Sequence, residues 1–283
     1  MAFVAVLITV GCSSERPTSG EVIVAAGDIT SCSGTGDEAT AKLVGGIDGM
    51  VLTLGDEAYP EGSAEDFGEC YEPSWGRFKD RTKPVPGNHE YYTEEAEEYF
   101  DYFGKAAGDP DEGYYSYDLG TWHLVALNSN CQEVHCATTS PQVQCLKADL
   151  AANDDKRCAL AYFHHPLFTS GKYRLGIPEV KPLWEDLYKA GADVVLNGHD
   201  HNYQRFAPQD PEGGADPEQG IREFVVGTGG ANHYPIVAPI ENSEVHNDDT
   251  YGILKLTLRP KGYEWRFLPA GGEFTDSGSD RCH

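Results

Sequence analysis

Five short segments of this chain each follow an apolar run and carry side chains that bind metal ions. Together they offer carboxylate, phenol, amide and imidazole groups. A single catalytic metal ion needs only three or four protein ligands, so this set is large enough for two adjacent ions. In chain order the segments are Gly27-Asp28, Gly55-Asp56-Glu57-Ala58-Tyr59, Gly87-Asn88-His89-Glu90, His164-His165-Pro166 and Gly198-His199-Asp200-His201.

The residues in front of these groups are predicted to form buried strands, because they are short apolar runs bounded by glycine or polar residues. They cover residues 21–26, 50–54, 159–163 and 193–197. Residues 37–44 suit a helix, which gives a β-α-β unit and a parallel pairing of the first two strands. The candidate ligands therefore lie just beyond the C-terminal ends of predicted strands, where open α/β sheets place their sites.

Further elements complete the chain. Thr93 is a plausible helix start because two acidic residues follow it, and Gly104 would end that helix. Ser140 and Pro141 are predicted to open another helix. The remaining expectations are two strands within 114–128, a helix over 182–190, an exposed loop over 208–219 and strands over 223–227, 252–258 and 263–268.

A pair of metal ions suits displacement at phosphorus. A carboxylate shared by two cations holds them about 3.5–4 Å apart, as an in-line displacement requires. The pKa of water bound by such ions falls from about 15.7 to about 7. We therefore expect hydrolysis of a phosphoester in which metal-bound hydroxide attacks phosphorus directly, without a protein nucleophile.

The order of these motifs resembles that of the calcineurin-like metallophosphoesterases, which runs Gly-Asp, Gly-Asp, Gly-Asn-His-Glu/Asp, His and Gly-His-x-His. Tyr59, in Gly55-Asp56-x-x-Tyr59, is similar to the purple acid phosphatase variant. The resemblance spans residues 27–201 and a later Gly-Thr-Gly-Gly at 227–230. It implies an α/β fold, a four-layer αββα sandwich of two mixed β-sheets flanked by helices, in one catalytic domain over residues 21–283.

The resemblance also implies the ligand sets. The first metal ion would be held by Asp28, Asp56, Tyr59 and His201. Asp56 would bridge to a second ion, which Asn88, His164 and His199 complete. A phenolate at Tyr59 favours Fe(III) at the first position, with Zn, Mn or Fe(II) at the other. Taken singly, the aspartates could instead cap helices and Tyr59 could be a packed core residue.

The sequence specifies the substrate contacts less well than the metal ligands. His89 matches the family residue that contacts phosphate or protonates the leaving oxygen, as a general acid. Lys172 and Arg174 could reach the phosphate or could be solvated surface charges, and His165 could be structural. Plant purple acid phosphatases have further histidines in this region and this chain does not, so their substrate-binding details are in doubt. The candidate substrate contacts are Asn88, His89, His165, Lys172, Arg174 and Tyr203.

Three functions remain open at this point. A phosphomonoesterase similar to acid phosphatases is the first expectation. A phosphodiesterase on nucleotides, cyclic nucleotides or phospholipid headgroups is the alternative, because the same metal pair serves both reactions. A metal- or phosphate-binding surface protein with a degenerate site is the alternative without catalysis.

Composition limits the partners. The 283 residues are 40% hydrophobic, as in a folded protein with a sizeable core. The formal net charge of −25 argues against a nucleic acid polymer as partner, because so acidic a protein repels polyanions and no Lys/Arg cluster is present. A small phosphorylated substrate is compatible with this charge, since bound metal ions dominate the local field.

The N-terminal segment, residues 1–20, suits export. Its first 12 residues form an apolar run that is too short to span a bilayer and resembles a signal-peptide core, with an N-terminal strand as the alternative. Gly11 before Cys12 resembles a bacterial lipoprotein cleavage site, so Cys12 is a candidate membrane tether. Without Cys12, seven of the eight cysteines remain, which leaves one thiol unpaired. A zinc site is the competing interpretation for Cys131 and Cys136.

Overall fold

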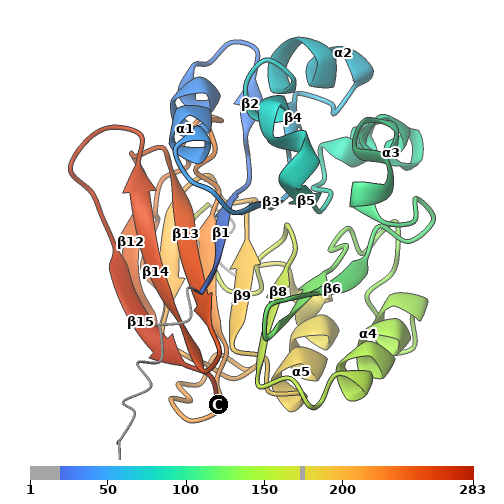
Figure 1. Cartoon of the computed structure of the whole chain (residues 1–283), viewed down its shortest axis with the longest axis vertical. Coiled ribbons are helices and arrows are strands. Elements are labelled where there is room, and N and C mark those ends of the chain that lie inside the picture. The colour runs from blue at the N-terminus through green and yellow to red at the C-terminus, as the bar shows by residue number, and fades with distance from the viewer. Residues whose placement is uncertain (1–19, 173–175) are drawn as a thin grey trace, which may run out of the picture.

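Two β-sheets lie face to face at the centre of the molecule, and helices lie on the outer side of each, while the strands over residues 262–281 keep an exposed outer face (Figure 1). The computed structural model describes residues 20–172 and 176–283. Cys12 and Arg174 lie outside these residues. The four-layer arrangement and the mixed character of both sheets confirm the fold that the sequence implied.

The first sheet carries three parallel strands whose ends supply candidate ligands. β1, β3 and β5 pair in parallel, in the register Ile23 to Met50 and Val51 to Thr82. The other three strands are antiparallel and follow β1 at its other edge. In sheet order the strands are β15 (Ser277–Arg281), β14 (Gly262–Pro269), β13 (Gly252–Arg259), β1 (Glu21–Ala26), β3 (Met50–Thr53) and β5 (Thr82–Pro84).

The second sheet has seven strands, of which β7, β8, β9 and β11 run parallel to their neighbours in that group. A two-stranded sheet of β2 (Thr30–Ser31) and β4 (Ala58–Tyr59) lies near the site. In sheet order the seven strands are β12 (Ser243–Asn247), β10 (Tyr203–Phe206), β11 (Arg222–Val226), β9 (Val194–Asn197), β8 (Cys158–Tyr162), β7 (Trp122–Ala126) and β6 (Tyr115–Leu119).

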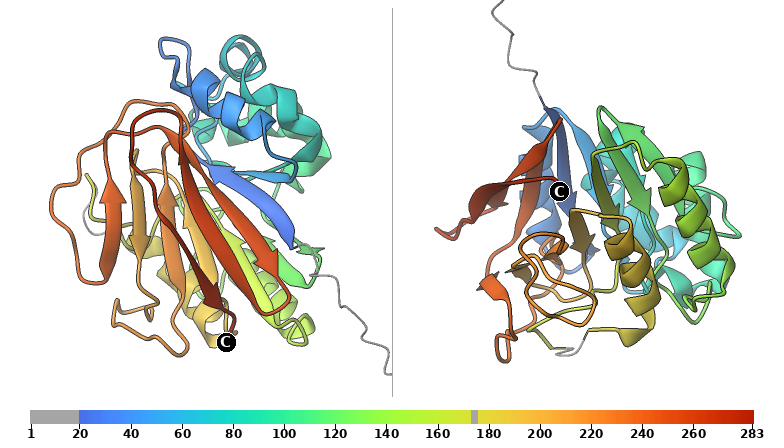
Figure 2. Two further views of the ribbon diagram at one scale, coloured as in Figure 1. Left: turned by 60° about the vertical axis from the view of Figure 1, so that its left-hand side comes forward. Right: turned by 90° about the horizontal axis from the view of Figure 1, so that it is seen from below.

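Side-chain alternation along the strands divides the core into two layers. Along β8, Leu160 and Tyr162 face the first sheet and are fully buried between the sheets. Ala161 and the following Phe163 face the other way, onto α4 (Pro141–Ala152) and α5 (Lys181–Lys189). Figure 2 shows the two sheets from two further directions, with these helices on the outer side of the second sheet.

Shorter helical segments surround the ends of the first sheet's strands. The segment from α1 to η2 packs on that sheet, with Val44 of α1 and Trp75 of η2 fully buried. These helices are α1 (Gly36–Gly45), α2 (Ala64–Asp66), η1 (Phe67–Tyr71), η2 (Trp75–Arg81), η3 (Glu90–Tyr92), η4 (Glu94–Ala96), α3 (Glu97–Phe103) and η5 (Gly104–Ala107), with η6 (Pro178–Val180) before α5.

The expected helix after Thr93 begins later than predicted. Glu95 and Ala96 both have φ of 52°, a left-handed conformation that interrupts the helix, so α3 starts at Glu97. The Thr93 hydroxyl donates to the carbonyl of Glu90 and does not cap α3. The prediction for Ser140 is confirmed, because its hydroxyl accepts the backbone N–H of Val143 at the start of α4.

Three disulfides join the described cysteines, and Cys145 is an exposed thiol. The pairs are Cys32–Cys70, Cys131–Cys136 and Cys158–Cys282. One unpaired thiol among seven cysteines confirms the count from the sequence. The zinc interpretation of Cys131 and Cys136 is wrong, because their sulfurs bond to each other. Within residues 20–172 and 176–283, no helix combines the length and the apolarity needed to cross a membrane.

Candidate metal centre

The candidate ligands meet where strands of both sheets end. Asp28 follows β1, Asp56 follows β3, and His164 and His199 follow β8 and β9. Asp28, Asp56 and His199 have φ of 56°, 52° and 69°. A left-handed backbone at a residue other than glycine costs roughly 1 kcal/mol or more. This conformation turns the chain sharply after each strand and aims the side chains at one point.

Four atoms form a first ligand set around the Tyr59 phenol. Its Oη lies 2.9 Å from Asp28 Oδ1, 2.9 Å from Asp56 Oδ2 and 2.9 Å from His201 Nε2. His201 Nε2 is also 3.1 Å from Asp28 Oδ1. The two carboxylates are buried, and Tyr59 is half-buried.

A second ligand set surrounds His164, and it shares an atom with the first. His164 Nε2 lies 3.2 Å from Asn88 Oδ1, 3.2 Å from His199 Nδ1 and 3.3 Å from Asp56 Oδ2. Asp56 Oδ2 therefore belongs to both sets. Two groups of three at the site have ligand atoms within 4.8 Å of one another and could each hold an ion: Asp28, Asp56 and His164, and His164, His165 and His199.

Backbone carbonyls fix the orientation of two imidazoles. His164 Nδ1 lies 2.8 Å from the carbonyl oxygen of Leu54, and His201 Nδ1 lies 2.6 Å from that of Asn232. A carbonyl oxygen only accepts, so both Nδ1 atoms carry hydrogen and donate. This arrangement turns each Nε2 toward the cluster, as outer hydrogen bonds commonly do for metal-binding histidines.

The cluster requires positive charge between its atoms. Burial alone would raise the pKa of Asp56, but the adjacent His164 and His89 hold it below its usual value. Burial alone would lower the pKa of His164, but Asp56 raises it to about 9. Asp56 Oδ2 and His164 Nε2 face each other with lone pairs and would repel. Either a proton or a metal ion must therefore lie between these two atoms.

The Tyr59 phenol also favours a bound cation beside it. Burial, and then the charges of Asp28 and Asp56, raise its pKa well above the usual value. Its single hydrogen can satisfy one of the three acceptors around it. A metal ion that displaced this hydrogen would satisfy all of them at once.

The spacings fit metal coordination. Atoms bound about 2.1 Å from one ion lie about 3.0 Å apart at right angles and about 3.4 Å apart at the tetrahedral angle. The contacts within the two sets, 2.9–3.3 Å, fall in this range. The donor types also fit, since the first set is richer in oxygen and the second adds two imidazoles.

Glu90 holds two ligand-bearing segments together, although the motif that contains it gave it no role of its own. Its carboxylate is fully buried and accepts the backbone N–H groups of Gly87, Asp56 and Glu57 at 2.7, 2.9 and 2.9 Å. It therefore ties the loop after β5 to the loop after β3. Burial, and then the charge of Asp56, raise the pKa of Glu90 to about 7. Its place at the end of Gly-Asn-His-Glu was the available signal.

Glycines make room for this arrangement. A side chain on Gly87 would place its Cβ 2.1 Å from Asp56 Oδ1, and one on Gly198 would place it 2.8 Å from Asp28 Oδ2. The later Gly-Thr-Gly-Gly segment, residues 227–230, contacts the backbone beside Asp28. Gly229 N donates to the carbonyl of Gly27 at 2.9 Å, and Ala231 N donates to that of Asp28 at 2.9 Å.

His89 stands beside the first ligand set and is partly exposed. Its Nδ1 lies 2.5 Å from the carbonyl oxygen of Pro60 and donates to it. Its Nε2 lies 3.9 Å from Asp56 Oδ2. The ring is in contact with Tyr59 and Tyr92, at centroid distances of 4.3 and 4.7 Å. The tautomer and the direction of Nε2 are thus fixed toward the centre.

Two other expected substrate contacts, Lys172 and His165, lie near the centre in different surroundings. Lys172 lies near the centre, with Nζ 4.2 Å from the ring of Tyr234, which stacks on His201 at 3.9 Å. His165 packs beside His164 and His199, with ring centroids at 4.8 and 4.5 Å. Burial, and then His164, lower the pKa of His165 to about 3, so this ring is neutral.

Tyr203 does not line the site, and this expectation is wrong. Its side chain is fully buried, its hydroxyl donates to Asp276 at 2.8 Å, and its ring packs on Phe267. Tyr203 begins β10, where side chains alternate between the two faces, and it falls on the core face.

Comparison with known proteins agrees with this geometry. Residues 16–203 match the calcineurin-like phosphoesterase family. Purple acid phosphatase 15 of Arabidopsis thaliana is 28% identical over 232 residues, which cover 70% of this chain and 43% of that protein. The chain thus spans less than half the length of this relative.

Two solved structures share the fold. A purple acid phosphatase from yellow lupin (Lupinus luteus) seeds superposes with a TM-score of 0.74 at 19% identity, over 93% of this chain and 54% of that one. The anchor in the inner membrane complex of Plasmodium superposes with a TM-score of 0.71 at 14% identity, over 94% of this chain and 90% of that one. With its motifs matched over two-thirds of its length and its ligand atoms gathered at the strand ends, this chain belongs to the calcineurin-like phosphoesterase family.

Proposed function

We propose that this chain hydrolyses phosphomonoesters at a centre of two metal ions. The observation that carries the proposal is the position of Asp56 Oδ2, which lies 2.9 Å from Tyr59 Oη and 3.3 Å from His164 Nε2. One oxygen thus lies within reach of both ligand sets, as in a carboxylate that bridges two ions through a single oxygen. Similarity to proteins named phosphatases supports a monoester as substrate.

The ions would be held by the residues already described. Asp28, Asp56, Tyr59 and His201 form the first set, and Asn88, His164 and His199 join Asp56 in the second. A phenolate at Tyr59 suits Fe(III), and the imidazole-rich second set suits Zn, Mn or Fe(II). Metal ions bound there would supply Lewis-acid chemistry, polarising the phosphoryl group and lowering the pKa of bound water toward neutrality.

His89 would deliver the proton to the leaving group. Because Nδ1–H is engaged by the Pro60 carbonyl, only the imidazolium form carries a hydrogen on Nε2. As the bond between phosphorus and the ester oxygen breaks, Nε2–H passes its proton to that oxygen and the ring becomes neutral. General acid catalysis of this kind contributes typically about 10²–10⁴-fold.

The test is turnover by the purified protein loaded with metal ions. We expect p-nitrophenyl phosphate to be hydrolysed faster than its bis-ester, and Asp56→Asn and His201→Ala to abolish both activities. Asp154→Asn and His246→Ala change an exposed aspartate and an exposed histidine and serve as matched controls. Full activity in Asp56→Asn and His201→Ala would refute the site. Preference for the bis-ester would replace the monoesterase with a phosphodiesterase, and metal binding without turnover of any ester would leave a binding protein.

We also infer export of this protein. Three disulfides fit an oxidising compartment, since they are rare in the cytosol. A lipid at Cys12 would be detected by metabolic labelling with a radioactive fatty acid. Labelling that persists in Cys12→Ala would exclude this tether.

A further inference from the structure

A chain of ring contacts passes through the first ligand set. The ring of Tyr59 is in contact with those of His89 and His201, at centroid distances of 4.3 and 5.7 Å. Next to His89 lies the ring of Tyr92, at 4.7 Å, and next to His201 lies that of Tyr234, at 3.9 Å. The contacts therefore lead from the metal ligands to two further aromatic side chains.

These two outer side chains, Tyr92 and Tyr234, differ in how far they are covered. Tyr234 stacks on His201 at an angle of 9° between the ring planes, and Lys172 Nζ lies 4.2 Å from its ring centre. Tyr92 is 62% exposed, the largest value among the exposed large hydrophobic side chains of residues 20–172 and 176–283. Its ring therefore offers open apolar surface beside His89.

The turn that carries Tyr92 directs its three side chains differently. Successive residues of a 3₁₀-helix point about 120° apart, and η3 holds Glu90, Tyr91 and Tyr92. Glu90 is buried and accepts the three backbone N–H groups described above. The Tyr91 hydroxyl accepts Asn128 Nδ2 at 2.7 Å. Tyr92 is thereby left to point outward, and its backbone N donates to the carbonyl of His89 at 3.2 Å.

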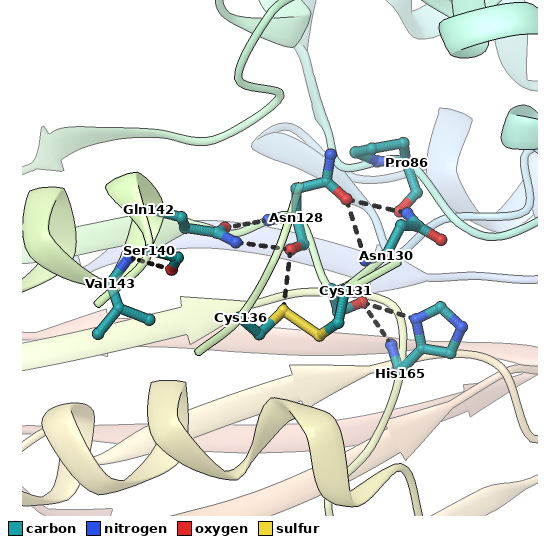
Figure 3. Close-up of a disulfide and its surroundings, with 10 residues drawn as sticks. Pro86, Asn128, Asn130, Cys131, Cys136, Ser140, Gln142, Val143 and His165 are labelled. Atoms are coloured by element: carbon teal, nitrogen blue, oxygen red, sulfur yellow. Dashed lines mark hydrogen bonds between the residues drawn. A yellow bond between two sulfur atoms is a disulfide. The ribbon is translucent and has the colours of Figure 1, made fainter. Parts of the chain in front are cut away.

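The partner of Tyr91 is itself fixed. Asn128 N donates to Gln142 Oε1 at 2.8 Å, and the carbonyl of Asn128 accepts Gln142 Nε2 at 2.9 Å (Figure 3). Glu90 thus holds the turn to the loop after β3, and Tyr91 holds it to the loop after β7. Tyr92 therefore keeps its place beside the proposed general acid.

The leaving group of a bound ester has to lie against His89, which would deliver its proton. Of the two rings that the structure describes in contact with His89, that of Tyr59 belongs to the first ligand set. Tyr92 is the other, so its open surface is available to a group bonded to the ester oxygen. Aromatic rings pair with one another, offset-stacked or edge to face, at about 4.5–7 Å between centroids. The position of Tyr92 therefore favours a leaving group that is itself an aromatic ring.

We propose that Tyr92 is a specificity-determining residue that packs on the leaving group, and that the preferred substrates are aryl phosphates, in which an aromatic ring is bonded to the ester oxygen. This inference rests on the proposed function, because His89 marks the place of the leaving group. Tyr92 takes no part in breaking the bond between phosphorus and oxygen and only adds contact area. A ring bonded directly to the ester oxygen comes next to Tyr92, whereas an alkyl group brings no ring to that place.

The contact is tested with O-phosphotyrosine and O-phosphoserine, which differ in whether a ring is bonded to the ester oxygen. The ratio of kcat/KM between native protein and variant, taken for each ester separately, cancels the difference in intrinsic reactivity. We expect Tyr92→Ala to lower kcat/KM for phosphotyrosine about three- to tenfold, the usual strength of an aromatic pair, and mainly through KM. The value for phosphoserine should change less than about twofold.

Further variants separate the ring from its bulk. Tyr92→Phe keeps the ring and should behave like the native protein, whereas Tyr92→Leu keeps apolar bulk and should restore only part of the preference. Val237→Ala removes apolar surface at a second exposed side chain, 52% exposed, and should change kcat/KM for neither ester. An equal loss for both esters in Tyr92→Ala would make Tyr92 a positioning residue for His89, and no loss for either ester would leave it without a role. Either result overturns the proposal.

Binding tests the same contact without turnover. In benzylphosphonate and ethylphosphonate a CH₂ group stands in for the ester oxygen. By calorimetric titration of the protein loaded with metal ions, Tyr92→Ala should reduce the preference for benzylphosphonate about three- to tenfold, and Tyr92→Phe should keep it. If the native protein shows this preference but hydrolyses no ester, the proposed function fails and the contact stands. If the native protein hydrolyses both esters and Tyr92→Ala keeps the full preference, the proposed function stands and the assignment of Tyr92 fails.

Discussion

The phenol of Tyr59 keeps its proton in the absence of a cation, because burial and the charges of Asp28 and Asp56 raise its pKa. Iron(III) at the first ligand set would replace that proton and give a visible charge-transfer band from phenolate to iron. We predict a purple iron-loaded protein and a colourless Tyr59→Phe variant. The measurement is a visible spectrum beside an iron assay. A colourless native protein that contains iron would show that Tyr59 does not bind it.

At the scale of loops, Glu90 holds two ligand-bearing segments together through three backbone N–H groups. Glu90→Gln replaces one acceptor oxygen with an NH₂ group, which leaves a buried backbone donor unpaired. We expect the free energy of unfolding to fall by about 1–3 kcal/mol and metal affinity to weaken. Urea unfolding and metal titration measure the two effects. Glu133→Gln, at an exposed position, should change neither, and equal behaviour of the two variants would contradict the role of Glu90.

His123 joins the hairpin of β6 and β7 to α4. It lies 3.0 Å from Asp118 Oδ1 and 2.8 Å from Asp149 Oδ2. Burial alone would lower the pKa of His123, but hydrogen bonds to Asp149 and Asp118 raise it above its usual value. A raised pKa in the folded state stabilises the protein fully below about pH 6.5, the unfolded value, and this stabilisation is lost as pH rises through the folded value.

We therefore predict that His123→Asn costs more stability at pH 6 than at pH 9, by about 1–2 kcal/mol. The difference between native and variant unfolding free energies in urea, taken at each pH, isolates this residue. His246→Asn, on the exposed face of β12, should show no such dependence. A difference that grows with pH would reverse the sign of the argument.

The sequence specified the ligand-bearing elements better than the rest of the fold, for a physical reason. β1 matches its predicted bounds because a buried parallel strand is a continuous apolar run. β12 and β15 went unpredicted, because strands at the sheet edges are short and polar here. The late start of α3 depends on left-handed backbone at Glu95 and Ala96. Neither glutamate nor alanine is a residue type that predicts this conformation.

The same limit applies to the site. Motif order placed the seven ligand candidates, since each motif ends a strand. It did not place Tyr203, whose direction depends on the face that β10 turns to the core. Leu54 and Asn232 orient His164 and His201 through their backbone carbonyls, and no local pattern marks either residue.

Across the whole molecule, the two sheets contribute different ligands. The oxygen donors follow strands of the first sheet, and the three imidazoles follow β8 and β9 of the second. The centre exists only while the sheets are packed together, so metal binding should stabilise the entire fold. We expect EDTA to lower the free energy of unfolding by about 3 kcal/mol if the ions were present at about one hundred times their dissociation constant. Asp56→Asn should show little response to EDTA, and a native protein without such a response would contradict the shared centre.

The disulfides act over very different spans, and their removal should separate stability from function. Cys158–Cys282 closes a loop of 124 residues and ties the end of the described chain to β8, whereas Cys131–Cys136 spans 5. Cross-links over long loops restrict the unfolded chain most, so replacing both Cys158 and Cys282 by serine should cost about 2–5 kcal/mol. Replacing Cys131 and Cys136 should cost less in urea unfolding yet weaken metal binding, because Asn130 Nδ2, next to this disulfide, donates to the carbonyl of Pro86, two residues before Asn88 (Figure 3). Equal stability losses with unchanged metal affinity would show that the short disulfide does not support the site.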